Sequence, residues 1–200
     1  MKFNFLKMAC AVLILTVSGL ANATLILEGG TGSTGAGNII LNGGTSVDVA
    51  HSAYFDGATT PASDWVWDLA NSDGIANPLD FTFSFSLAGF DVLTAELSGL
   101  WGVDNVGSVF LNGNLISSLP DVVTNNFNVL HALSAGPGSS AFVAGLNVLS
   151  FNVGNRGGPG AFRASVKVTA DVKPIPEPST LAIFALGMIG LASRRFKRQS

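Results

Sequence analysis

Acidic and amide side chains gather near predicted turns in the middle of the chain. Asp73 stands in an Asn-Ser-Asp-Gly stretch, and Asp104 is followed by Asn105. Calcium prefers several carboxylate and carbonyl oxygens, so Asp73, Asp104 and Asn105 are candidate calcium ligands. The spacing of an EF-hand loop is absent. Asp and Asn also favour turns without any metal, and this alternative stays open. No other cofactor is expected.

Aromatic side chains offer a second kind of chemistry, stacking on sugar rings. The three tryptophans, Trp65, Trp67 and Trp101, together with Tyr54, combine an apolar face with a polar edge, which suits such a role. Trp65 and Trp67 are two residues apart and would share one face of a strand. Packing in the core is the alternative, and the hypothesis of ligand binding is kept beside it.

Residues for catalysis are sparse. The only histidines are His51 and His131, and no G-x-S-x-G or H-E-x-x-H stretch places either beside a nucleophile or a metal. Gly30–Gly35 fits G-x-G-x-x-G, but a strand-like sequence follows it instead of the helix that a dinucleotide site needs. Two carboxylates such as Glu28 and Glu96 could form a glycan hydrolase. We therefore expect no enzymatic activity and keep a hydrolase as the alternative.

The charge distribution excludes one class of partner. The formal charge is −3 for 200 residues, but residues 24–178 hold all thirteen acidic residues and only four of the ten basic ones. A phosphate-binding surface needs clustered Lys and Arg, so nucleic acid is not expected as a partner.

The elements that must position these residues are strands. Period-two alternation recurs, most clearly in residues 81–87, 149–153 and 162–170, and no helical period is seen between 24 and 171. Further strands are expected at residues 39–41, 64–68, 93–101, 108–111 and 126–130. Glycine-rich turns separate them. This pattern predicts an all-β domain, a β-sandwich or jelly roll.

The N-terminal sequence has the order of a secretory signal peptide. Lys2 and Lys7 precede an apolar run from Met8 to Leu20, and Ala21-Asn22-Ala23 is a cleavage site of the small-x-small type. The run is too short for a comfortable membrane span, and a retained anchor is the alternative. The single cysteine, Cys10, lies inside this segment, so the mature chain has neither a disulfide nor a thiolate metal site.

The C-terminal sequence ends in a proline-rich strap, an apolar block and a basic cluster. The apolar block runs from Leu181 to Ala192 and would span about 18 Å as a helix, against about 30 Å of hydrocarbon. The positive-inside rule keeps the basic residues cytoplasmic and leaves the acidic middle exported. The basic residues are Arg194, Arg195, Lys197 and Arg198.

Two resemblances follow from these motifs. Pro176-Glu177-Pro178, the short apolar segment and the basic end resemble the PEP-CTERM sorting signal. That resemblance implies export through the inner membrane, transient anchoring by the C-terminal helix, processing by an exosortase near Pro176-Glu177-Pro178, and a setting of exopolysaccharide and biofilm production. A tail-anchored protein with a proline-rich linker is the alternative.

The second resemblance concerns the middle of the chain. Phe81 to Leu87, the Trp-x-x-Asp-Asn stretch at 101–105, Leu-Asn-Gly at 111–113 and Gly-x-Asn-x-Leu-x-Phe-x-Val at 145–153 are similar to the galactose-binding-like jelly roll. Such folds include carbohydrate-binding modules as well as domains with no ligand, so the fold alone does not define a function.

The sequence therefore predicts four segments: a signal helix at 1–23, a β-sandwich at 24–172, a Pro-rich linker at 173–179, and a short hydrophobic helix with a basic tail at 180–200. We expect a non-enzymatic protein of the cell surface or extracellular matrix. A carbohydrate-binding module for envelope polysaccharide is the alternative.

Overall fold

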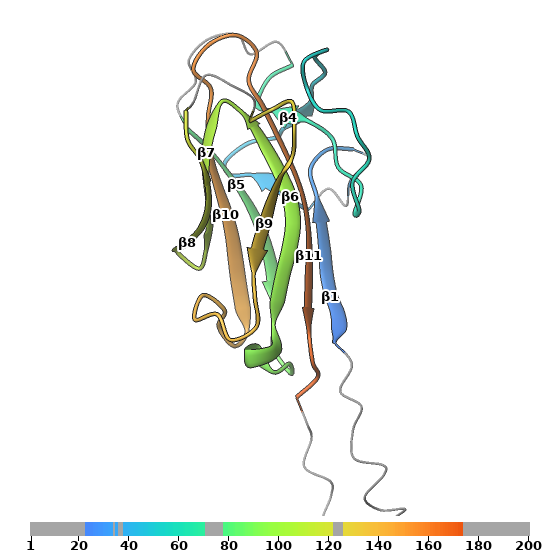
Figure 1. Ribbon diagram of the computed structural model, residues 1–200, viewed down its shortest axis with the longest axis vertical. Helices are drawn as coiled ribbons and strands as arrows, with labels where there is room; N and C mark the ends of the chain where they lie inside the picture. The colour runs from blue at the N-terminus through green and yellow to red at the C-terminus, as the bar shows by residue number, and fades with distance from the viewer. Residues whose placement is uncertain (1–22, 34, 36–37, 71–77, 122–125, 174–200) are drawn as a thin grey trace, which may run out of the picture.

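A computed structural model describes residues 23–33, 35, 38–70, 78–121 and 126–173. The described residues form two packed antiparallel sheets (Figure 1), which confirms the predicted all-β sandwich. The predicted signal helix and C-terminal hydrophobic helix lie outside these residues. Within the described ranges, no helix combines the length and apolar character that crossing a membrane requires.

The first sheet is ordered β3-β4-β11-β6-β9, with β1 also paired to β11. Its central strand, β11, pairs with β6 from Ala161 to Thr169 and with β1 from Ser165 to Ala170. The strands of this sheet are β1 (Thr24–Gly30), β3 (Val47–Asp48), β4 (Val66–Trp67), β6 (Glu96–Asp104), β9 (His131–Ala135) and β11 (Ala161–Ala170).

The second sheet is ordered β2-β5-β10-β7-β8. Its strands are β2 (Ile40–Leu41), β5 (Leu79–Ser86), β7 (Val106–Leu111), β8 (Asn114–Leu119) and β10 (Leu146–Gly154). The predicted alternation is confirmed in β5, where Phe81, Phe83 and Phe85 are buried and the intervening residues are not.

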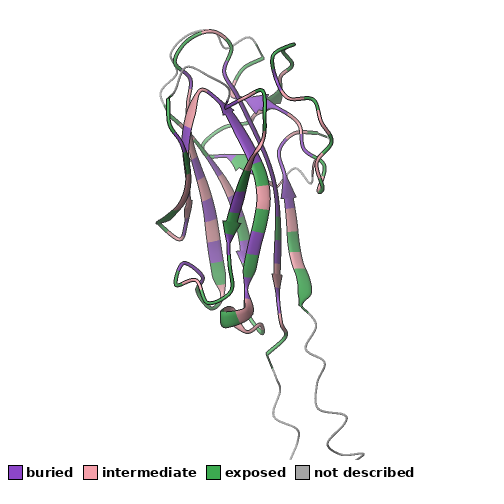
Figure 2. Ribbon diagram, in the orientation of Figure 1, coloured by how far each residue is buried: buried purple, intermediate pink, exposed green. Residues whose placement is uncertain are grey.

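The core lies between the two sheets (Figure 2), where their inward-facing side chains interdigitate. Phe162 of β11 packs against Phe81 and Phe151 of the opposite sheet, with ring centroids 4.6 and 5.0 Å apart. With no cysteine after Cys10, packing of this kind holds the sandwich together.

Two expected strands differ in the structure. The strand expected at 93–101 begins at Glu96, because Asp91 caps a short 3₁₀ turn, η1 (Val92–Thr94), and its side chain accepts a hydrogen bond from Leu93 N at 3.1 Å. The described part of 126–130 is not a strand, and the neighbouring strand starts at His131. There the Asn126 side chain donates to backbone oxygens of two other segments.

Candidate functional site

A cleft of about 550 Å³ lies at the end of the sandwich where β3, β4 and the loop between them meet the start of β11. Its lining mixes rings, carboxylates and hydroxyls: Ser33, Asp48, Val49, Ala50, His51, Ser52, Tyr54, Phe55, Asp56, Ser63, Asp64, Trp65 and Arg163. In Figure 1 the β3–β4 loop is the blue-green chain beside the top of the sandwich.

Arg163 holds the base of the cleft together. Its guanidinium donates to Ser63 Oγ, to Phe55 O and to Gly57 O, each at 3.0 Å. Arg163 is only 6% exposed, and this burial lowers the pKa of the guanidinium while nearby Asp64 and Asp56 raise it. The side chain therefore fastens the β3–β4 loop to β11 and fixes the shape of the cleft.

Aromatic rings form one wall of the cleft. The rings of His51, Tyr54 and Trp65 follow one another, with centroid separations of 5.3 and 5.0 Å. Trp65 Nε1 donates to Phe55 O at 2.9 Å, which fixes the orientation of the indole. Tyr54 and Trp65 are largely buried, whereas His51 is exposed at the rim.

Three carboxylates also line the cleft. Asp48 accepts hydrogen bonds from the backbone N and the hydroxyl of Ser33, so it fastens the segment after β1. Asp56 is exposed at the rim and Asp64 is partly buried. Arg163 and His51 are the basic side chains among the lining residues, and with histidine counted as neutral the three carboxylates give the cleft a net negative formal charge.

The tryptophans separate into two environments. Trp65 belongs to a small cluster with Tyr54 and Ala161 beside the cleft. Trp67 and Trp101 are fully buried in the main core, so neither ring has a face open to a sugar. Because these two rings are buried, the hypothesis that they stack on a sugar is wrong, and both pack in the core instead. Trp65 lines the cleft described above, and neither Trp67 nor Trp101 is among its lining residues.

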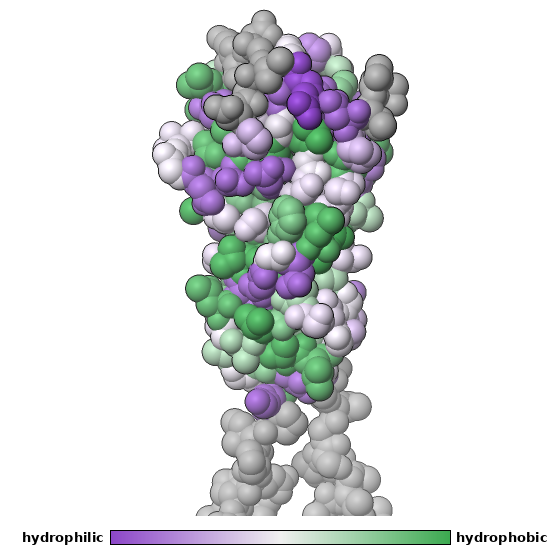
Figure 3. Space-filling model, turned by 90° about the vertical axis from the view of Figure 1, so that its left-hand side faces the viewer, coloured by the Kyte–Doolittle hydropathy of each residue, from purple (hydrophilic) through white to green (hydrophobic). Residues whose placement is uncertain are grey.

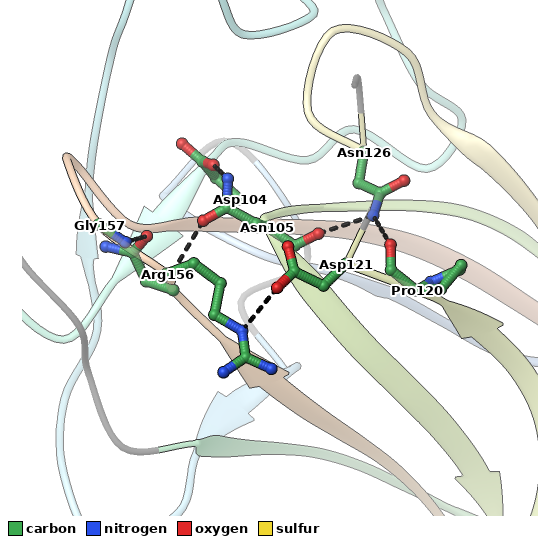
Figure 4. Close-up of polar contacts among 8 residues, drawn as sticks. Asp104, Asn105, Pro120, Asp121, Asn126, Arg156 and Gly157 are labelled. Atoms are coloured by element: carbon green, nitrogen blue, oxygen red, sulfur yellow. Dashed lines mark hydrogen bonds and ion pairs between the residues drawn. The ribbon is translucent and has the colours of Figure 1, made fainter. Parts of the chain in front are cut away.

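Two of the candidate calcium residues, Asp104 and Asn105, belong to a hydrogen-bonded cluster (Figure 4) that Tyr54 joins to the cleft. Asp104 accepts hydrogen bonds from Asn105 Nδ2 and, at 3.4 Å, from the Tyr54 hydroxyl, while Asn105 Oδ1 accepts from Arg156 N at 2.8 Å. Protein donors thus point at the oxygens that a cation would need, which favours the turn alternative. Asp73 lies outside the described residues.

A metal site built from His, Cys, Asp or Glu side chains is not found elsewhere in the described ranges either. Across them, no group of three or more His, Cys, Asp or Glu side chains is placed to hold a metal ion.

Burial raises the pKa of Asp104, and the hydrogen bond from Tyr54 opposes this rise. Burial, with the charge of Asp104, raises the pKa of the Tyr54 hydroxyl.

The carboxylates considered for a hydrolase stand apart. Glu28 of β1 is opposite Lys167 of β11, which is opposite Ser98 of β6, and Glu96 is two residues before Ser98. With strands about 4.8 Å apart and a rise of about 3.4 Å per residue, the Cα atoms of the two glutamates are about 12 Å apart. Neither glutamate is among the residues that line the cleft, so the cleft does not bring this pair of carboxylates together around a glycosidic bond.

Sequence reasoning missed most of the cleft. His51 is an exposed cleft residue, and His131 begins β9 away from it. The clustering of Asp48, Asp56, Asp64 and Arg163 depends on the path of the β3–β4 loop, so a sequence pattern does not predict it. A signal was present in the acidic spacing of 48, 56 and 64 around Tyr54 and Trp65. The predicted cleavage and sorting residues other than Ala23 lie outside the described residues.

The C-terminal segment and the β-sandwich are each similar to known proteins. Residues 174–198 match the family model described as the PEP-CTERM protein-sorting motif, which confirms that resemblance. No curated protein matches the chain.

Among solved structures, similarity is found to carbohydrate-binding modules. A family 36 module in complex with calcium and xylotriose shares 13% identity and a TM-score of 0.36, covering 73% of this chain and 99% of that one. The family 36 module of a xylanase from the hindgut metagenome of Trinervitermes trinervoides shares 7% identity and a TM-score of 0.41, covering 76% and 100%. A family 35 module from Clostridium thermocellum shares 12% sequence identity and a TM-score of 0.35, and the match covers 73% of this chain and 98% of that one.

Proposed function

We propose that this chain is an exported, non-enzymatic protein of the cell surface or extracellular matrix whose β-sandwich binds polysaccharide in the cleft around Trp65. The C-terminal sorting motif supports export and processing by an exosortase. The observation that carries the binding proposal is the cleft itself, where rings and carboxylates converge on one hollow.

The lining suits a sugar. Sugar rings have apolar C–H faces and hydroxyl edges, so they need an aromatic surface beside hydrogen-bond acceptors. Phe55 and His51 supply ring surface near the rim, and Asp56 and Asp64 supply acceptors. Arg163 and the Trp65 indole are already held by backbone oxygens of the loop, so the cleft is preorganised before a ligand binds.

The charge of the cleft selects a class of polysaccharide. Three carboxylates against one guanidinium repel polymers that carry uronate or phosphate groups. We therefore propose a neutral polysaccharide of the envelope or matrix, which is consistent with a biofilm setting.

The test is a pair of rim substitutions. The double variant His51→Ala, Asp56→Ala changes exposed residues and should leave folding intact. A hydrogen bond to a charged group contributes about 1.5–3 kcal/mol, so affinity for the host polysaccharide should fall about 10- to 100-fold or more. Isothermal titration calorimetry of the wild type and the double variant, with neutral and anionic polymers and with and without calcium, measures these affinities.

A matched control identifies the surface. Asp80→Ala removes an exposed carboxylate from the outer face of β5, where it accepts a hydrogen bond from Asn152 Nδ2 at 2.8 Å. Its affinity should equal that of the wild type. Equal affinity of the rim variant and the wild type, or loss in the Asp80 variant alone, would overturn the assignment to the cleft.

A further inference from the structure

Three chain segments meet at the end of the sandwich opposite the cleft. The turn after β5 is joined to the β9–β10 loop and to the chain after β11 by backbone hydrogen bonds. They run from Leu87 N to Gly145 O at 2.8 Å, from Gly138 N to Leu93 O at 2.9 Å and from Lys173 N to Gly89 O at 2.9 Å. Phe90 also forms a bridge with Val172. These segments thus make one continuous surface.

This surface exposes large apolar side chains. Leu93 is 71% exposed, Leu146 67%, Val172 54% and Val143 43%. We call these four residues the apolar end. On the side of the molecule that Figure 3 shows, hydrophobic residues gather in the lower half, above the place where the described chain begins and ends. An exposed group of large apolar side chains on a protein surface indicates a site that contacts another protein or a membrane.

Both ends of the described chain lie beside the apolar end (Figure 1). Thr24, the first residue of β1, pairs with Ala170, the last residue of β11. Arg163, at the base of the cleft, is seven residues earlier on the same strand, or about 23 Å away. The apolar end and the cleft therefore occupy opposite ends of the sandwich.

The length of chain beyond Lys173 restricts what can cover the apolar end. The hydrophobic segment starts at Leu181, eight residues after Lys173, and this stretch reaches at most about 29 Å. Three prolines in it favour an extended chain of about 3.1 Å per residue, or about 25 Å. When the tail is inserted in a membrane, this end of the sandwich is the one held near the lipid.

The charges around the apolar end select the lipid surface. Asp91, Glu96 and Asp171 lie in the same segments or next to them, and they outnumber the two bases there, Lys167 and Lys173. Three acidic groups disfavour strongly anionic headgroups, so a zwitterionic lipid surface fits best.

We propose that the apolar end docks on the zwitterionic lipid surface of the membrane that holds the C-terminal segment, and that this docking directs the cleft away from the membrane. Leu93 and Leu146 enter the interfacial layer, which is about 5–8 Å thick on each side of the hydrocarbon. The proposal depends on tail insertion and does not require the cleft to bind polysaccharide.

Single-cysteine labelling tests this docking in the full chain. Cys10 is the only cysteine, so Cys10→Ser gives a cysteine-free background. An environment-sensitive fluorophore is placed by Leu93→Cys at the apolar end or, as the matched control, by Ser52→Cys at the cleft. Both positions are exposed, so both variants should fold. The chains are reconstituted into vesicles of phosphatidylethanolamine and phosphatidylcholine.

The label at 93 should shift its emission to shorter wavelength and be quenched by lipids spin-labelled near the headgroup, whereas the label at 52 should do neither. Adding Leu146→Ser and Val172→Ser should abolish the wavelength shift, although the tether still keeps the label near the membrane. Equal emission at 93 and 52 would overturn the proposal. So would a shift that grows with protein density in the vesicle, because a second copy would then cover the apolar end.

Discussion

Trp101→Ala separates a core role from a ligand role for a fully buried tryptophan of the first sheet. Trp101 is 0% exposed, its ring centroid is 6.2 Å from that of Phe151, and its Nε1 donates to Ser117 Oγ at 3.1 Å. A Cβ on Gly107 would be 3.0 Å from the indole, which shows how closely β7 covers the ring. Removal of the indole therefore leaves a cavity that the sheets cannot readily close.

The expected cost is about 3–5 kcal/mol of unfolding free energy, typical of a buried Trp→Ala change. For a chain of this size, about 1 kcal/mol corresponds to about 2–4 °C in Tm, so Tm should fall by about 6–20 °C. Thermal unfolding followed by circular dichroism measures the change. The matched control is Leu115→Ala, at a residue 59% exposed, which should stay within about 0.5 kcal/mol of the wild type.

Affinity for polysaccharide supplies the second half of this prediction. Below its own Tm, the Trp101→Ala variant should bind as tightly as the wild type, because Trp101 does not line the cleft. An unchanged Tm together with lost binding would refute the reasoning and restore Trp101 as a ligand residue.

Three further predictions follow from other parts of the molecule. Gly99→Ala should lower the unfolding free energy by about 1–3 kcal/mol, because the added Cβ would be 2.4 Å from Ser165 O. Urea unfolding measures this change, and an unchanged midpoint would contradict the close packing of β6 on β11. Burial raises the folded-state pKa of Asp104, so the folded state holds its proton more tightly and stability from this group falls as pH rises from about 4 through the raised value. Urea unfolding across that range should show a smaller fall in Asp104→Asn, and identical pH profiles would refute the burial effect. Replacement of Pro176, Glu177 and Pro178 by alanine should prevent processing, and an intact mass still ending at Ser200 in the wild type would contradict cleavage.

Much of the fold could be predicted from the sequence, because strand alternation is a local property. The Phe81–Leu87 alternation is a local signal, and the buried face of β5 follows it. The alternation predicted for 162–170 is only partly seen, because β11 is buried on both faces from Ala161 to Val166. The start of β6 could not be predicted in the same way, since the apolar Val92 and Leu93 belong to a 3₁₀ turn that the Asp91 side chain caps. Strand propensity alone does not reveal that this capped turn precedes the strand and delays its start to Glu96.

The candidate site could be predicted only in part. Trp65 and Trp67 look equivalent in the sequence, yet one faces the cleft cluster and the other the main core, because β4 pairs over only two residues. The role of Arg163 depends on contacts with residues one hundred or more positions away. Contacts of that range arise from the sandwich topology and leave no local pattern.

The most direct test of the central claim uses the three tryptophan indoles as internal reporters. In a ¹H–¹⁵N spectrum of the labelled protein, saturating neutral polysaccharide fragments should shift the indole signal of Trp65, which lines the cleft, and leave those of Trp67 and Trp101 in place. Backbone shifts should map to residues 48–56 and 63–65. Shifts confined to the outer face of β5, β7 and β10, or no shift with any host polysaccharide, would contradict polysaccharide binding in the cleft.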